Sequence, residues 1–438
     1  MTNYIIDDLL EFEGLSEVIT LESEHNDQAL ELSSTARNES RQWQIYLQAL
    51  GLIIFQEWLR KREPEISLNR EACSVLQPHY ANVIDAVCNL QVGEFKFCLI
   101  PTICFTDEEV IVPRAVIDLP EFAAHFYVVI GIEEDLDIAA IRGFLRYDQL
   151  FNLHSELQAD RDWNYPLPMA WFNREPDELL LYLRCLEPPA IPLPEIPSNR
   201  QATLSQVQTE LVSLLPQLRN QPLWKVLSWE QGAAVLTSPD LLQWLYQLPS
   251  GNIATLTTHL SDLLKLLTQQ AVDASLWLQN QIEEVVQDMS WKVLPAPSPM
   301  RDSEQSHAEE LEDILKEISA SSGMEIPSSV GRAYQDLSLD ETKLRLYALT
   351  WSLDGDREWS LLLILGASPN SLLPYGVKLR VSDQKEVLWE EELQADSNDA
   401  YLYTQIEGTY EEKFLATITA ANRETQTLCL FEFSREQQ

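Results

Sequence analysis

Apolar and polar positions follow the clearest helical period in residues 36–62. Large apolar side chains recur there at intervals of three and four residues, which places them on one face of an α-helix. This stripe consists of Trp43, Leu47, Leu50, Ile54 and Trp58. Basic residues at 60–62 suit the negative end of a helix dipole, and Pro64 ends the helix. We therefore predict a long helix whose whole stripe, Trp43 included, packs in a core.

Between Val83 and Leu186 the period shifts to two, in short runs of β-branched and aromatic residues. The runs include VIVPRAVI, HFYVVIGI, AIRGFLRY and, at 179–185, LLLYLRC. Prolines and glycines separate them, so we predict five or more short strands. Because a short sheet needs an apolar cover, we expect a small antiparallel β-barrel or curled sheet that packs against the long helix. Together they form a predicted domain at 1–186.

The middle of the chain changes character twice. Five prolines fall within residues 187–197 and predict a stiff, extended linker at 187–200. Leu, Gln and Trp then dominate 201–294 at helical spacing, including the stretches 253–267 and 272–291, so we predict a helical domain there. Its tryptophans favour core packing, with the lining of a pocket as the alternative: Trp224, Trp229, Trp244, Trp277 and Trp291.

Residues 295–343 are acidic and contain one short amphipathic pattern, so we predict a linker that carries a helix. The narrow apolar seam of this helix consists of Leu311, Ile314, Leu315 and Ile318. Such a helix in a flexible linker is a common docking element for a partner protein. The alternative, a helix packed on its own neighbouring domain, fits the pattern equally well.

Seven short runs of alternating residues fill 344–438, beginning with KLRLYALTW and ending with TLCLFEF. Strands at this spacing predict an immunoglobulin-like β-sandwich. The whole chain is therefore expected to be a multidomain α+β protein.

The balance of charges changes the functional picture more than the composition does. The chain has 69 acidic residues against 30 Lys and Arg, a formal net charge of −39. This charge repels nucleic acid and anionic membranes and attracts basic proteins; the alternative is that it serves only solubility. Two acidic runs are candidate contacts for a basic partner: Glu133, Glu134 and Asp135, and Glu390, Glu391 and Glu392.

The acidic N-terminus differs from a signal peptide, and the apolar runs are short, so we expect a cytoplasmic protein without a membrane span.

Motifs for catalysis or cofactor binding are missing from the sequence. The six histidines form no zinc-type cluster, and no CxxC, GxGxxG, GxxxxGK[ST] or GxSxG pattern occurs. Cys98 and Cys104 with His125, or Cys185 with His154, are conceivable reactive groups, but buried cysteines usually serve packing. We expect no catalytic, cofactor or metal residues, and hence a non-enzymatic protein.

Two stretches carry a family resemblance: RQWQIYLQALGLIIFQEWL from Arg41 to Leu59, and the segment from Val112 to Leu150 with its valine-proline step and GFL strand. With LLPYGVKLRVSD, from Leu372 to Asp383, they are similar to the cyanobacterial family called domain of unknown function 1822. The family supplies no catalytic residues. Its genes are often found near extracytoplasmic-function sigma factors and caspase-like genes, so the resemblance implies a signalling or regulatory setting.

Three hypotheses follow. The first is a regulatory module that sequesters a basic protein, such as a sigma factor, and loses affinity as salt rises. The second is a small-molecule sensor, or a hydrolase, with a pocket between the barrel and the helical domain; a closed cavity lined by Trp and converging polar groups would favour it. The third is a scaffold, or a caspase-like protease substrate cut within 295–343.

Overall fold

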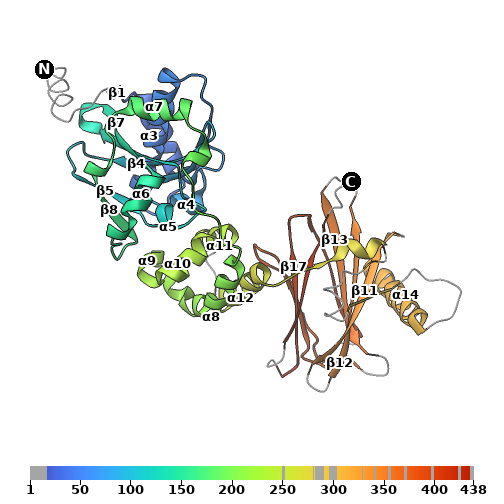
Figure 1. Cartoon of the computed structure of the whole chain (residues 1–438). Helices are drawn as coiled ribbons and strands as arrows, with labels where there is room; N and C mark the ends of the chain where they lie inside the picture. Colours follow the sequence, from blue (N-terminus) through green and yellow to red (C-terminus); the bar gives the residue numbers. More distant parts are fainter. Residues whose placement is uncertain are drawn as a thin grey trace. The chain divides into compact units, whose positions relative to one another are not determined.

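The computed structural model describes residues 17–248, 252–279, 281, 291–294, 303–327, 329–339, 342–353, 357–368, 372–395, 399–422 and 426–434. The chain divides into two compact units, Met1–Ser250 and Gly251–Gln438. Both units combine helices with sheets, which confirms the mixed α+β class (Figure 1).

The first unit is built on a six-stranded sheet. Its strand order is β1 (Ile19–Thr20), β7 (Ile138–Arg146), β6 (Phe126–Glu133), β4 (Phe95–Thr102), β3 (Val87–Val92) and β2 (Leu68–Asn69). All neighbours are antiparallel except β4 and β6, which run parallel because a long crossover connects them. The predicted barrel is therefore not confirmed, and the sheet is mixed rather than antiparallel.

The crossover between β4 and β6 contains β5 (Glu109–Pro113) and the short helix α5 (Ala115–Asp118). The run VIVPRAVI is thus part strand and part helix. β5 pairs with β8 (Asn164–Pro168) in a separate two-stranded sheet.

The predicted long helix is α3 (Glu39–Arg62), and it packs on the six-stranded sheet. Leu47, Leu50, Ile54 and Trp58 are buried as expected. Trp43 is 43% exposed and stacks on Tyr46 instead, so its placement in the core was wrong. α3 approaches the sheet closely at Gly51, where an added Cβ would lie 2.6 Å from Cγ of Pro101.

The prediction of a strand at 179–185 is wrong, because these residues belong to the helix α7 (Pro176–Cys185). Proline in the first turn, followed by Asp177 and Glu178, is a typical helix start. α7 lies on the same sheet face as α3, since Tyr182 stacks on Phe126 and Phe55 of α3 contacts its neighbour Phe97.

The remaining helices of this part are short. The α-helices are α2 (Ser23–Ser33), α4 (Pro78–Ala81) and α6 (Tyr147–Leu153). The 3₁₀ turns are η1 (Ser74–Leu76), η2 (Glu134–Leu136), η3 (His154–Glu156), η4 (Met169–Trp171) and η5 (Pro188–Ala190).

A cluster of four helices completes the first unit: α8 (Arg200–Leu218), α9 (Leu223–Val226), α10 (Trp229–Leu236) and α11 (Pro239–Gln247). The proline-rich segment 187–200 lies inside this unit, and its Ile191 is buried. The boundary between the units falls at 250/251 and divides the segment 201–294, which we expected to be one helical domain.

The second unit is a β-sandwich with a helix on each outer face. One sheet has the order β10 (Trp291–Val293), β11 (Gly331–Leu339), β12 (Thr342–Ser352), β13 (Glu358–Ala367) and β16 (Tyr401–Thr409). The other has the order β15 (Val387–Glu392), β14 (Lys378–Ser382), β17 (Phe414–Thr419), β18 (Gln426–Glu432) and β9 (Val272–Asp273). Apolar residues of both sheets form one core.

All seven runs predicted in 344–438 are strands of this sandwich, but an immunoglobulin-like topology is not confirmed. The predicted linker 295–343 also contributes β11, because the apolar residues Ala333 and Leu337 enter the shared core. Of the predicted helical stretch 272–291, the described residues form β9, the 3₁₀ turn η6 (Ala274–Gln279) and the start of β10; residues 280 and 282–290 lie outside the described part.

The helices α12 (Ile253–Thr268) and α14 (Ser303–Ser322) cover the two sheets of the sandwich. α12 contacts β14 and β17, and α14 packs on the sheet that contains β11 and β12 (Figure 1). α12 therefore belongs with the sandwich and not with α8–α11. Over the described residues, no helix combines the length and apolar character that crossing a membrane requires.

Candidate ligand-binding site

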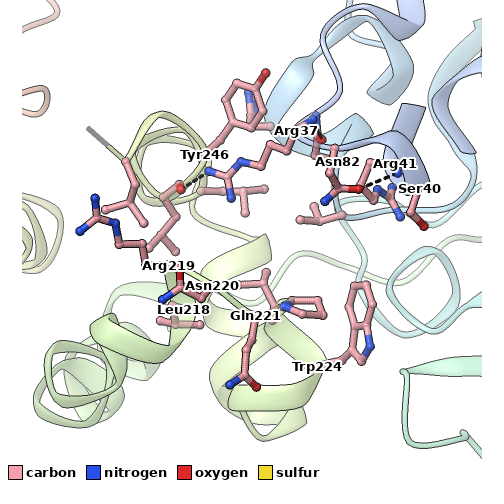
Figure 2. Close-up of a pocket in the computed structure, with 18 of the residues that line it drawn as sticks. Arg37, Ser40, Arg41, Asn82, Leu218, Arg219, Asn220, Gln221, Trp224 and Tyr246 are labelled. Carbon is pink, nitrogen blue, oxygen red and sulfur yellow. Dashed lines mark hydrogen bonds between the residues drawn. The ribbon is translucent and has the colours of Figure 1, made fainter. Parts of the chain in front are cut away.

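A cavity of about 700 Å³ lies within the first unit, between the start of α3 and the four-helix cluster (Figure 2). One wall comes from residues 37–44 and 79–85, and the other from 218–224 and the end of α11. The size is typical of pockets that hold small organic ligands.

The first wall begins where the chain enters α3. The Asn38 side chain caps the helix by accepting a hydrogen bond from the backbone N–H of Arg41 at 3.0 Å. Arg37 and Arg41 therefore stand at the positive end of the helix dipole, where cations are disfavoured. This placement concentrates positive charge at one edge of the cavity.

Hydrogen bonds fix the turn before α3 against both walls. The backbone N–H of Arg37 donates to Oδ1 of Asn82 at 3.0 Å, and the Tyr246 hydroxyl donates to the Thr35 carbonyl at 2.8 Å. The Arg37 guanidinium lies 4.9 Å above the Tyr246 ring and donates to the Leu245 carbonyl. Residues 35–37 thus join α4 and α11 around the cavity.

Arg41 is held by fewer groups than its guanidinium has donors. Nη1 donates to Oδ1 of Asp85 at 2.7 Å, and Nη2 donates to the Ala81 carbonyl at 2.8 Å. Its Nε–H is buried and has no hydrogen-bond partner among the described residues. An unsatisfied buried donor costs free energy, so the groups around Arg41 hold its guanidinium without satisfying all of its donors.

The charges of the lining are unusual for so acidic a chain. Three arginines and one carboxylate, that of Asp85, line the cavity. His79 also lies there, and burial lowers its pKa below the ordinary value, so its ring is neutral at pH 7. Figure 2 shows that Arg219 extends away from Arg41. The cations at the α3 edge are therefore Arg37 and Arg41.

The opposite wall is largely apolar with a polar edge. Leu218 and Leu223 are buried, Trp224 is half-buried, and Asn220 and Gln221 are exposed at the turn between α8 and α9. A cavity with apolar walls and a few polar groups can hold a ligand that is part apolar and part charged.

A second cavity of about 130 Å³ adjoins the first and shares Trp224 with it. Trp163 and Trp229 line this smaller cavity, with ring centroids 5.5 Å apart. Trp163 has a φ of +60°, and its ring presses on Gly232, where an added Cβ would lie 2.0 Å away. Because Gly232 has no side chain, the Trp163 ring can pack closely on it and hold α10 against the segment before β8.

The expected tryptophans thus divide between the two roles. Trp224 and Trp229 line cavities, while Trp244, Trp277 and Trp291 are buried in cores. Trp163 was not anticipated.

The apolar seam of α14 lies against its own sheet. Its four members, Leu311, Ile314, Leu315 and Ile318, are between 0% and 6% exposed and form one cluster with Tyr347, Leu349 and Trp351. Glu312 pairs with Arg332, and Glu310 with Arg345, which fixes the helix at its polar edges. The structure therefore shows the alternative arrangement, a helix packed on its own domain, and not an exposed docking element.

The acidic run at 133–135 lies at the end of β6 and in η2. Glu133 is half-buried, and Glu134 and Asp135 are exposed. Oε1 of Glu134 accepts a hydrogen bond from the Tyr46 hydroxyl at 2.7 Å. One of the three carboxylates is therefore already engaged within the chain.

The run at 390–392 lies on β15, at the edge of a sheet in the second unit. Glu390 pairs with Lys378 at 2.9 Å and with Arg380 at 3.5 Å. Glu391 is exposed, and Glu392 is half-buried. Because the two runs belong to different units, the structure assembles no single acidic site from them.

Among the described residues, no hydrogen bond joins a candidate cysteine to a candidate histidine. Burial raises the pKa of Cys98 well above its ordinary value, which disfavours the nucleophilic thiolate. Nδ1 of His125 accepts from the Lys96 backbone N–H at 2.8 Å, and Sγ of Cys104 lies 3.0 Å from the Thr106 hydroxyl. These contacts are structural.

In the other candidate pair, Cys185 with His154, Nε2 of His154 lies 3.0 Å from Oδ1 of Asp118, and Cys185 is exposed at the end of α7. Across the described ranges, no cluster of three or more His, Cys, Asp or Glu side chains could hold a metal ion.

A protein-family model matches most of the chain. The family described as "Protein of unknown function (DUF1822)" matches residues 19–429. No curated protein and no solved structure matches the chain significantly. The match covers both units and confirms the family resemblance; cyanobacterial origin stays a prediction. The chain belongs to the DUF1822 family of proteins of unknown function.

Proposed function

We propose that this protein binds a small molecule in the larger cavity of the first unit and acts as a sensor of that molecule. The observation that carries the proposal is the cavity itself, about 700 Å³ in volume and lined by residues far apart in the sequence. Polar groups of α3 and an indole of the helix cluster line the same space, which is the lining expected for the small-molecule hypothesis.

A ligand in this place would contact both walls at once. It would bridge the start of α3 and the turn between α8 and α9, so binding would stabilise the position of the helix cluster on the sheet. Any ligand that binds the folded state alone raises the stability of the fold. A sensor requires that its ligand favour one arrangement of the protein, and a ligand that contacts both walls would favour the arrangement in which they are close.

Binding of a basic partner, such as a sigma factor, has weaker support in the geometry. The seam of α14 is buried, and Glu134 and Glu390 already have partners within the chain. That hypothesis depends on the net charge of −39. The scaffold hypothesis depends on the segment 295–343, of which residues 303–322 form a helix.

Thermal unfolding of the full chain against a panel of common metabolites tests the proposal. A ligand at about 100 times its Kd adds about 2.7 kcal/mol, which raises the Tm of a unit of this size by roughly 5–10 °C. Asn220→Trp would fill the cavity from an exposed position at its rim and should abolish the rise.

Gln217→Trp is the matched control, because Gln217 is exposed three residues away on α8 and does not line the cavity. It should keep the rise in Tm. A ligand that stabilises wild type and Asn220→Trp equally would place binding elsewhere and overturn the proposal.

A further inference from the structure

The cavity collects positive charge in a chain that is otherwise strongly acidic. Arg37 and Arg41 lie within one turn of each other at the start of α3. The partial positive charge of the helix N-terminus adds to theirs. The one acid in this first turn, Glu39, is not among the lining residues. Such an arrangement lowers the energy of an anion at this edge.

The guanidinium groups also retain hydrogen-bonding capacity. Nη1 and Nη2 of Arg41 each carry a second N–H beyond their bonds to Asp85 and the Ala81 carbonyl, whereas the Nε–H is buried and has no partner in the described part of the chain. The Arg37 side chain donates to a neutral carbonyl, that of Leu245, and no carboxylate among the described residues pairs with it. Charge-assisted bonds to an oxyanion are stronger than those to neutral acceptors.

The opposite wall provides a different chemistry. Trp224 and the leucines of the helix cluster offer an apolar surface, and the indole is half-buried and faces the cavity (Figure 2). A flat apolar group can stack on an indole ring. The two walls together therefore suit a ligand with an acidic end and an apolar end.

We propose that the ligand is a small organic anion whose carboxylate or phosphate binds Arg37 and Arg41 and whose planar apolar part packs against Trp224. This inference rests on the proposed function, since it names the class of ligand that the same cavity takes. Asp85 limits the affinity for the anion, because the Asp85 carboxylate competes with it for Nη1 of Arg41.

Calorimetric titration of the full chain with four naphthalene compounds tests the charge requirement. The probes are 2-naphthoate, 2-naphthyl phosphate, 2-naphthol and 2-naphthylmethylamine, which share the ring and differ in the charged group. At least one anion should bind about tenfold or more tightly than 2-naphthol, as one to two charged hydrogen bonds imply, and the amine should bind most weakly. The tighter of the two anions identifies the acidic group.

Two substitutions test the residues. Arg37→Gln should weaken the anions by roughly tenfold and leave 2-naphthol unchanged. Asp85→Asn should tighten the anions, because it releases Arg41 from its carboxylate partner; a merely structural role of that ion pair predicts the opposite. Arg60→Gln is the matched control, since it removes the same charge from the other, exposed end of α3, and it should change nothing.

The outcomes separate this inference from the proposed function. Equal affinity for 2-naphthol and the anions, or anion binding that Arg37→Gln and Asp85→Asn leave unchanged, overturns the anion inference. If no probe binds while metabolites still stabilise wild type and not Asn220→Trp, the anion inference fails and the proposed function stands. If neither probes nor metabolites bind in a way that Asn220→Trp abolishes, both fail.

Discussion

At the scale of single residues, His125 shows how burial determines protonation in the first unit. The residue is 7% exposed, its Nδ1 accepts from the Lys96 N–H, and its ring contacts Phe95 edge-on. Burial, with the positive charge of Lys96, lowers its pKa to about 4. The fold therefore binds the neutral ring and opposes the charged one.

This depressed pKa predicts an acid sensitivity. The unfolded chain binds the proton near pH 6.5, and the folded chain only near pH 4, so the contribution of His125 to stability is complete above pH 6.5 and is lost as pH falls toward 4. We expect a loss of about 2 kcal/mol after allowance for solvent screening. Urea denaturation at several pH values measures it.

His125→Asn is the control for this prediction, because the Asn side chain keeps an acceptor near the position of Nδ1 and does not titrate. The difference in stability between wild type and His125→Asn should shrink between pH 6.5 and pH 4. A difference that is constant over this range would mean that His125 is not the titrating group.

The residues of the cavity could be found from the sequence only in part. Arg37 and Arg41 precede an apolar stripe at the wrong end of the helix dipole, and this is a local signal that we did not use. That residues 218–224 lie opposite is a tertiary fact, since no local pattern relates the two segments. Asp85 and Asn82 likewise belong to the site only through the fold.

At the scale of elements, α14 shows what an amphipathic pattern does and does not determine. The spacing of Leu311, Ile314, Leu315 and Ile318 identified the face to be buried, and the structure confirms that this face is buried. The pattern is the same whether the helix packs on a partner or on its own sheet. The outer face of β11 and β12 determines where α14 packs, because the aromatic side chains on that face would otherwise be exposed to water.

The packing of α14 predicts a cost for truncating the seam. Leu311 is 0% exposed, so Leu311→Ala should lower the free energy of unfolding of the second unit by about 2–5 kcal/mol. Glu309→Ala, at an exposed neighbouring position, should change it by less than about 0.5 kcal/mol. Guanidinium denaturation followed by tryptophan fluorescence compares the two. Equal stability of both variants would show that the helix does not depend on this contact.

The error at 179–185 has a physical cause at the same scale. A run such as LLLYLRC is too short for its period to distinguish a strand from a buried helix. The decisive signals lie just before it, in Pro176 and the two acids that follow. The strands of the sandwich were predictable because clear alternation repeats across the segment 344–438.

At the scale of the whole molecule, α12 is the element whose assignment the sequence could not decide. Its composition resembles that of α8–α11, but it packs on the sandwich through Asp262, which is 0% exposed. Arg380 donates to both carboxylate oxygens of Asp262, at 2.9 and 3.0 Å, and the Ser382 hydroxyl donates at 3.0 Å. This buried ion pair joins α12 to β14 of the sandwich.

The unit boundary predicts which fragment folds. Residues 252–438 should fold cooperatively, whereas 201–294, which lacks the sandwich, should not. Within 252–438, Asp262→Ala should cost about 3–5 kcal/mol, because it removes both hydrogen bonds of buried Arg380 to a carboxylate and leaves it, among the described residues, only the longer contact with Glu390 at 3.5 Å. Glu391→Ala, an exposed acid on β15, is the control. Circular dichroism during denaturation provides the comparison, and an unchanged stability of Asp262→Ala would contradict the role of the pair.

Equilibrium dialysis can show whether the cavity of the first unit binds a small molecule. Wild type, Asn220→Trp and Gln217→Trp are dialysed against a small-molecule extract of the native cells, and retained compounds are identified by mass spectrometry. We expect a compound enriched by wild type and Gln217→Trp and lost from Asn220→Trp, with an acidic group on a planar apolar body. Retention of the same compounds by all three proteins, or of none by wild type, would contradict it.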